Sequence, residues 1–243
     1  MLRELFKLWK EADEHRLFDE VVTDFERILA QGRKVTTLAL RTLLEERDPE
    51  PVRAEIYRTD HEINNLEQSI RRRIVTHLTI NPRSNVTSCL ILMRLAKDGE
   101  RIGDYGKNIY QLYCRGGRVP RHHLYPELVT LFALMEASFD PTIKAYKESQ
   151  ADMARDAIQR LYKACKHCDE LVFGLLGETE VECAVTYALV FRFMKRILGH
   201  LKNINTSVVM PLDKLDFFDD VLRFQFYEDS TCGPEAGTSS EKS

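Results

Sequence analysis

Two carboxylates lie four residues apart in the segment "AKDGERIGDYGKNIY". They belong to Glu100 and Asp104, and the flanking sequence is typical of one continuous helix, so both side chains should lie on the same helix face. Like charges at this spacing repel one another. A folded protein that keeps them there needs a counterpart, which could be a Lys or Arg side chain, bulk water or a metal ion.

An earlier segment, "TDHEINNLE", carries Asp60 and Asn64 at the same four-residue spacing. Antiparallel packing of two helices could bring them opposite Glu100 and Asp104, so that four oxygen-bearing side chains converge on one seam. Helical bundles hold Fe, Mn, Mg or Zn ions with ligands of this kind. Acidic pairs are also common on solvated helix faces. Three nearby basic residues could neutralise the pair instead: Arg94, Lys97 and Arg101.

The elements that would position these residues are helices, because apolar residues recur at three- and four-residue intervals through most of the chain and no convincing strand pattern is present. Helix breakers occur at six places: Asp48 to Pro51, Asn81 to Pro82, Gly116 to Pro120, Phe139 to Pro141, Gly174 to Gly177, and Pro211. The sequence therefore predicts an all-α fold of six helices with short connections between antiparallel neighbours.

An internal repeat groups these six helices into three plus three. At an offset of 95 residues, "SCLILMRLAKDGERIGDYGKNI" aligns with "CAVTYALVFRFMKRILGHLKNI", matching Arg101 with Arg196 and Lys107 with Lys202. We expect two pseudosymmetric three-helix bundle repeats side by side, over residues 1–117 with an N-terminal extension and 118–211. A C-terminal segment, 212–243, ends in a Gly-, Ser- and Glu-rich tail that we expect to be disordered.

Composition excludes several classes of protein. The chain has 243 residues, 44% of them apolar, and a net charge of −3 from 35 basic and 38 acidic residues mixed along its length. This balance offers no broad basic surface for nucleic acid. No signal peptide or membrane-spanning run is apparent, which predicts a cytoplasmic protein, and the six cysteines are then best interpreted as reduced thiols.

The cysteine pair in "CKHC", Cys165 and Cys168, has the spacing of a zinc half-site. A second pair at matching spacing is missing, although His200 could lie near, so buried or idle thiols are the favoured interpretation. No P-loop, G-x-S-x-G or H-E-x-x-H motif is present, and catalysis is not expected. The alternative is a carboxylate-bridged metalloenzyme of the helical-bundle type, which would need a Glu-x-x-His motif and an enclosed pocket.

"DHEINNLE … IRRRIVTHL" followed by "GERIGDYGKNI" closely resembles the signature of the PhoU family, the phosphate-uptake regulators. The resemblance extends over roughly Phe18 to Met210. It implies two three-helix PhoU repeats, a multinuclear metal site on the protein surface, and a cytoplasmic adaptor that restrains phosphate import and signals phosphate sufficiency to a sensor kinase. Carried over residue by residue, it implies that the metal ligands are Asp60, Asn64, Glu100 and Asp104.

The second repeat departs from that family pattern. Asp152 and Asp156 in "ADMARDAIQ" keep the paired acidic positions, but Lys195 stands where the family has glutamate and Gly199 where it has aspartate. The Lys195 ammonium could take the role of the cation and pair with Asp152 or Asp156. With two of the four family ligands missing, Asp152 and Asp156 would form at most a weak second metal site.

The resemblance thus predicts a metal-binding adaptor, not an enzyme, that regulates phosphate uptake and phosphate-starvation signalling. Its partners would be a phosphate transporter, a sensor histidine kinase or both at the membrane, and a homodimer is possible. The cofactor would be a divalent or trivalent metal ion such as Fe, Zn, Mn or Mg.

Overall fold

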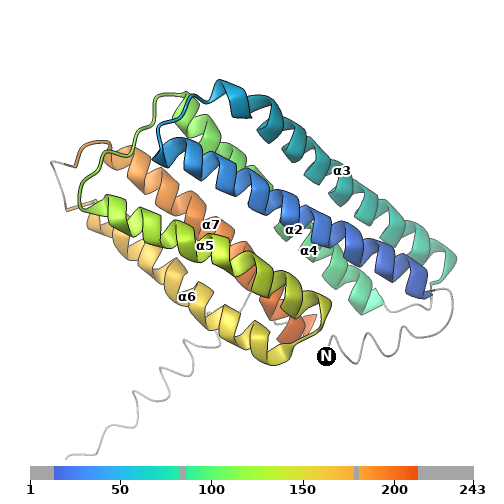
Figure 1. The fold of residues 1–243 in the computed structure, drawn as a ribbon. Helices are drawn as coiled ribbons and strands as arrows, with labels where there is room; N and C mark the ends of the chain where they lie inside the picture. The colour runs from blue at the N-terminus through green and yellow to red at the C-terminus, as the bar shows by residue number, and fades with distance from the viewer. Residues whose placement is uncertain (1–13, 83–85, 178–180, 213–243) are drawn as a thin grey trace, which may run out of the picture.

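The computed structural model describes residues 14–82, 86–177 and 181–212 (Figure 1). These residues form α-helices connected by turns and contain no strand. The helices are α2 (Glu14–Leu44), α3 (Glu50–Ile80), α4 (Val86–Cys114), α5 (Leu124–Lys147), α6 (Ala151–Gly174) and α7 (Ala184–Val209). Over these residues, the predicted all-α fold of six helices is confirmed. The predicted N-terminal extension, and all of the predicted C-terminal segment beyond Leu212, lie outside the described residues.

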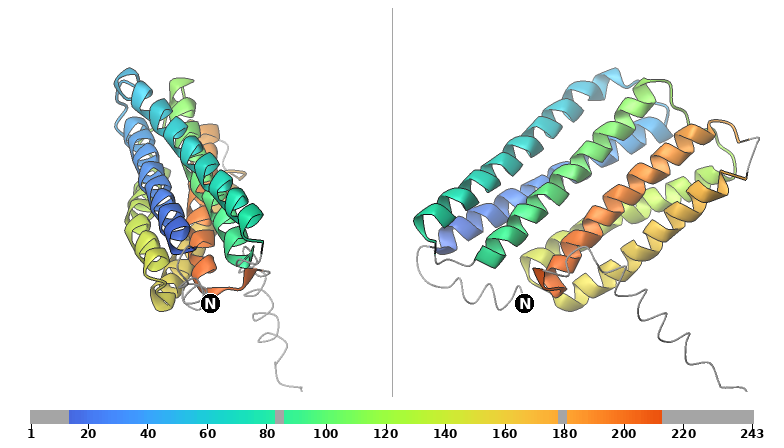
Figure 2. Two further views of the ribbon diagram at one scale, coloured as in Figure 1. Left: turned by 90° about the vertical axis from the view of Figure 1, so that its right-hand side faces the viewer. Right: turned by 180° about the vertical axis from the view of Figure 1, so that it is seen from behind.

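The helices form two groups of three, α2 to α4 and α5 to α7, which pack side by side (Figure 1). Seen from behind, α3, α4, α7 and α6 lie next to one another in a layer, with α2 and α5 on its other side (Figure 2). The two groups meet where α4 packs against α7 and α2 against α5. The layer therefore has one face covered by α2 and α5 and one outer face without a further described helix.

Helix α4 lies very close to α2 because glycines face it. A Cβ atom added at Gly99 would lie 2.5 Å from Ile28 Cγ2, and one at Gly106 would lie 2.9 Å from Val35 Cγ1. Since Glu100 and Lys107 each follow such a glycine by one residue, they are turned about 100° away from α2. This rotation places them toward α3 and the outer face.

The predicted break at Phe139 to Pro141 is wrong, because α5 continues through Pro141 to Lys147. Proline removes a single backbone hydrogen bond from the helix, and the flanking Phe139 and Tyr146 are fully buried on the core side. Burial of these large rings favours a continuous helix over a break. The chain turns instead at Ser149, whose φ of 50° is left-handed.

None of the helices in the described ranges combines the length and the low charge needed to cross a membrane.

Candidate functional site

Three of the four predicted ligands come together between α3 and α4. Asp60 and Glu100 are buried, and the side chain of Asp104 is 25% exposed. A fourth carboxylate, Glu67, lies at the same junction and is also buried. We call these four carboxylates, Asp60, Glu67, Glu100 and Asp104, the acidic seam.

Lys107 lies between two members of the acidic seam. Its Nζ donates to both carboxylate oxygens of Asp60 at 2.8 Å and to Oδ1 of Asp104 at 3.3 Å. Burial alone would lower the pKa of Lys107, but the hydrogen bonds to Asp60 and then to Asp104 outweigh it and raise that pKa. The ammonium group therefore stays charged at neutral pH and bridges the two helices.

Lys97 has the same role at the other end of the acidic seam. Its Nζ lies 2.6 Å from Glu100 Oε2 and 3.9 Å from Glu67 Oε1. Glu67 is also paired with Arg71, at 2.6 Å. Sequence reasoning missed Glu67, although it follows Asp60 by seven residues, which is two helical turns and therefore the same face of α3.

The carboxyl group of Glu100 is buried close to other acids of the seam. Burial raises the pKa of Glu100 above its usual value, and the neighbouring carboxylates of Asp104 and Glu67 add to the shift, while Lys97 opposes it. The charged form of Glu100 thus depends on Lys97, or on another cation near it.

The remaining predicted residues lie around this cluster or away from it. Asn64 is half-buried between Asp60 and Glu67 in the sequence of α3. Arg101 contacts Asp104, with 3.4 Å between Nη1 and Oδ2, as one of the anticipated neutralising residues. Arg94, the other arginine considered, does not contact Asp104. It pairs with Asp98 on the side of α4 that faces α7.

The oxygen donors of the acidic seam are of the type that hard cations prefer. Within the described part of the chain, however, no three His, Cys, Asp or Glu side chains are grouped so that they could hold a metal ion. The ammonium groups of Lys97 and Lys107 already lie against the carboxylates. Their side chains are 32% and 20% exposed, so both can turn toward solvent. Metal binding here stays a prediction, and it requires these lysines to move.

The second half does not assemble the corresponding acidic group. Asp152 is fully exposed and pairs with Arg155, and Asp156 is also exposed. Lys195 pairs with Asp169 and with neither predicted aspartate. The cause is the helix register: Cys165 Sγ donates to the carbonyl of Lys195, so Lys195 lies beside the middle of α6. Asp169 is about 20 Å further along that helix than Asp156.

The cysteines of "CKHC" are buried thiols. Burial, with a smaller contribution from Cys165, raises the pKa of Cys168 to about 12, so this thiol is protonated at neutral pH. His200 is engaged elsewhere, with its Nδ1 2.7 Å from Asp98 Oδ1. These contacts favour a packing role for both cysteines.

Residues 25–112 match the family model of the PhoU domain. The chain is 25% identical over 211 residues to a phosphate-specific transport system accessory protein PhoU homolog from Synechocystis, covering 80% of this chain and 91% of that protein. A protein of the same description from Deinococcus radiodurans is 41% identical over 71 residues, or 29% of this chain and 32% of that protein. The resemblance to the PhoU family is confirmed.

The fold is also similar to the crystal structure of PhoU from Pseudomonas aeruginosa, with a TM-score of 0.68 at 20% sequence identity. The alignment covers 80% of this chain and 96% of that one. It extends well beyond the residues that match the family model, so the helix arrangement of both halves is that of a PhoU protein.

Proposed function

We propose that this protein, whose residues 25–112 match the PhoU domain, is an accessory protein that regulates phosphate uptake and phosphate-starvation signalling. It acts by binding a phosphate transporter or a sensor kinase on the cytoplasmic side of the membrane. The observation that carries this proposal is the place of the acidic seam, because all four of its carboxylates fall within the matched residues. The curated relatives, named as accessory proteins of phosphate-specific transport, supply the class of partner.

The acidic seam is the proposed point of regulation. Asp60, Glu100 and Asp104, with Asn64 beside them, would hold an Fe, Zn, Mn or Mg ion once Lys97 and Lys107 turn outward. A bound ion would supply positive charge that can also reach oxygen atoms of a partner. Without it, the two lysines keep the carboxylates neutralised and the two helices joined.

A binding role is favoured over catalysis by the pairing of the carboxylates. Asp60 and Asp104 contact Lys107, Glu100 contacts Lys97, and Glu67 contacts Arg71. A general base needs a carboxylate that is free to accept a proton from a substrate. Each acid of the seam is instead engaged by a cation.

Complementation of a deletion strain tests the proposal. Cells that lack the protein should accumulate phosphate under replete conditions, and a Glu100→Ala, Asp104→Ala variant should complement poorly. The matched control is Asp152→Ala, Asp156→Ala, which removes two exposed carboxylates and should complement fully. Normal phosphate content and normal expression of phosphate-starvation genes in the deletion strain would falsify the proposed function.

Metal content is tested separately on protein purified without chelator or affinity tag. Elemental analysis should find Fe, Zn, Mn or Mg in the parent protein and in the control variant, and little in the Glu100→Ala, Asp104→Ala variant. Equal metal content in both variants would show that any bound ion lies outside the acidic seam.

A further inference from the structure

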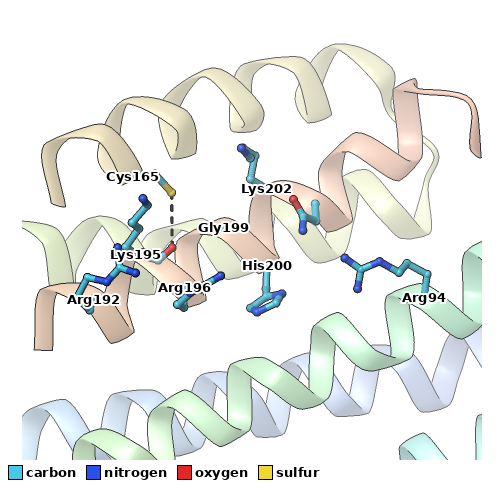
Figure 3. A pocket seen from close by; sticks show the side chains of 9 residues that line it. Arg94, Cys165, Arg192, Lys195, Arg196, Gly199, His200 and Lys202 are labelled. Atoms are coloured by element: carbon cyan, nitrogen blue, oxygen red, sulfur yellow. Dashed lines mark hydrogen bonds between the residues drawn. The ribbon is translucent and has the colours of Figure 1, made fainter. Parts of the chain in front are cut away.

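A groove of about 390 Å³ opens on the outer face of the molecule where α4, α6 and α7 meet (Figure 3). Arg192, Lys195 and Arg196 gather toward one end of it, and Arg94 reaches in from α4. We call it the basic groove, and its lining residues are Arg94, Cys165, Arg192, Lys195, Arg196, Gly199, His200, Lys202 and Asn203. No carboxylate is among these described lining residues.

Among the described residues, positive charge is in excess at the end of the groove formed by Arg192, Lys195 and Arg196. Asp169 contacts Arg192 and Lys195 at the edge of the groove, and Asp98 contacts Arg94 and His200. At that end of the groove the described residues supply three cationic side chains, those of Arg192, Lys195 and Arg196, against the one carboxylate of Asp169. Among the described residues, Arg196 makes no ion pair, and it is exposed to solvent.

The basic groove occupies the place in the second half that the acidic seam has in the first. Lys107 lies on Asp60 in the first half, whereas its aligned counterpart Lys202 lies 5.8 Å above the ring of Tyr162. The alignment also puts Lys195 opposite Glu100. Lys195 in place of Glu100 exchanges a negative charge for a positive one, so a surface that is balanced in one half becomes basic in the other.

Space for a ligand comes from Gly199, which is aligned with Asp104. No atom lies within 4 Å of the position that its Cβ would take. Lys202 also lines the groove and is 6% exposed. The groove thus combines an open hollow, a buried cation and a rim of arginines.

We propose that the basic groove binds a small phosphate-type anion, inorganic phosphate or pyrophosphate. Guanidinium groups match tetrahedral oxyanions with paired hydrogen bonds, and lysines add point charge. A volume of 390 Å³ is within the usual range for small-molecule sites, about 300–1,000 Å³. The site requires neither a metal in the acidic seam nor a protein partner, so it goes beyond the proposed function and can fail or succeed independently of it.

Isothermal titration calorimetry of the full chain with phosphate and with pyrophosphate tests this site. The parent protein should bind pyrophosphate saturably in low salt, and added salt should weaken the binding. Arg196→Glu and Gly199→Asp each place a negative charge at the groove in a position with room for it. Both should lower the affinity about tenfold or more, and Arg196→Lys should keep most of it.

The matched control is Arg72→Glu, which reverses the charge of an exposed arginine on α3 and should change the affinity by less than about twofold. Circular dichroism confirms that each variant is folded. Loss of binding in Arg72→Glu equal to that in Arg196→Glu would overturn the site, because the effect would then follow net charge alone. Absence of saturable binding by the parent would overturn it as well. So would binding to vesicles that contain phosphatidic acid when neither phosphate nor pyrophosphate binds, because the ligand would then be a lipid headgroup.

Discussion

At the scale of single residues, Lys107 decides the state of the candidate metal site. Its ammonium group contacts the same oxygen atoms of Asp60 and Asp104 that a metal ion would use. A metal must therefore displace the lysine, and its apparent affinity is reduced by the free energy of the ion pairs that are broken. The Lys107 ammonium group and a metal ion would occupy the same position between Asp60 and Asp104.

Replacing Lys107 with Ala should lower the free energy of unfolding by about 1–3 kcal/mol, because Asp60 is then left buried without its partner. Added Mn²⁺ should restore much of this loss if the acidic seam accepts a cation. Guanidinium denaturation with and without the metal measures both effects.

The control is Lys34→Ala at the exposed pair with Glu55, where the expected change is below about 1 kcal/mol and independent of metal. A Lys107→Ala variant as stable as the parent would show that the ammonium does not support the seam. A destabilised variant that ignores Mn²⁺ would exclude the cation site.

Sequence spacing was sufficient to bring Asp60, Glu100 and Asp104 together, because each pair shares a helix face and the two helices are antiparallel. It anticipated Lys97 and Arg101 among their partners but missed Lys107. Lys107 rather than Arg94 neutralises the cluster, and Lys195 pairs with Asp169, since these choices depend on how far one helix is shifted along the next. That shift is set by packing between helices, which the periodicity of one helix does not specify.

At the scale of elements, α4 is positioned by its glycines. Gly99 and Gly106 allow its backbone to approach α2 closely, and this approach fixes the rotation of α4 about its own axis. The rotation in turn directs Glu100 and Lys107 toward α3 and Arg94 toward α7. Both proposed sites thus depend on the same helix contact.

Two glycine to alanine substitutions on the third helix of each half should have opposite effects. Gly99→Ala forces a Cβ to within 2.5 Å of Ile28 and should destabilise the protein by about 1–3 kcal/mol. Gly199→Ala meets no atom within 4 Å and should stabilise it by about 0.5–1 kcal/mol, since alanine favours the helix. Thermal unfolding measures both. A neutral Gly99→Ala would mean that α2 and α4 can separate without loss.

The helices were largely predictable from the sequence. The exceptions are the break expected at Pro141 and the turn observed at Ser149. The break at Pro141 follows from a rule about backbone hydrogen bonds, whereas the observed helix follows from the burial of Phe139 and Tyr146 around it. The turn at Ser149 lacks the Gly or Pro that would have marked it. Tertiary packing outweighs a local signal in the first case, and in the second the local signal is missing.

At the scale of the whole molecule, the described contacts that join the two halves include a buried hydrogen bond between Asp98 and His200 and exposed ion pairs. Asp98 on α4 is 1% exposed and pairs with His200 on α7. Asp140 on α5 is 74% exposed and pairs with Arg33 on α2 at 2.7 Å. The first contact is shielded from water and the second is not, so the first should contribute more to the free energy of unfolding.

Asp98→Asn should lower the free energy of unfolding by about 1–3 kcal/mol, whereas Asp140→Asn should change it by less than about 1 kcal/mol. Guanidinium denaturation followed by circular dichroism should show one cooperative transition in the parent and in both variants. Two separate transitions in the parent protein would show that the halves unfold independently.

The joint between α4 and α7 also has a consequence for the order of events as the chain folds. Asp98 and His200 are 102 residues apart in sequence, while the helices of each half follow one another through short connections. Closing a long loop costs more entropy than closing a short one, so contacts between the halves should form late. The basic groove needs Arg94 from one half and Arg196 from the other. In a refolding experiment, affinity for pyrophosphate should therefore return more slowly than the helical signal.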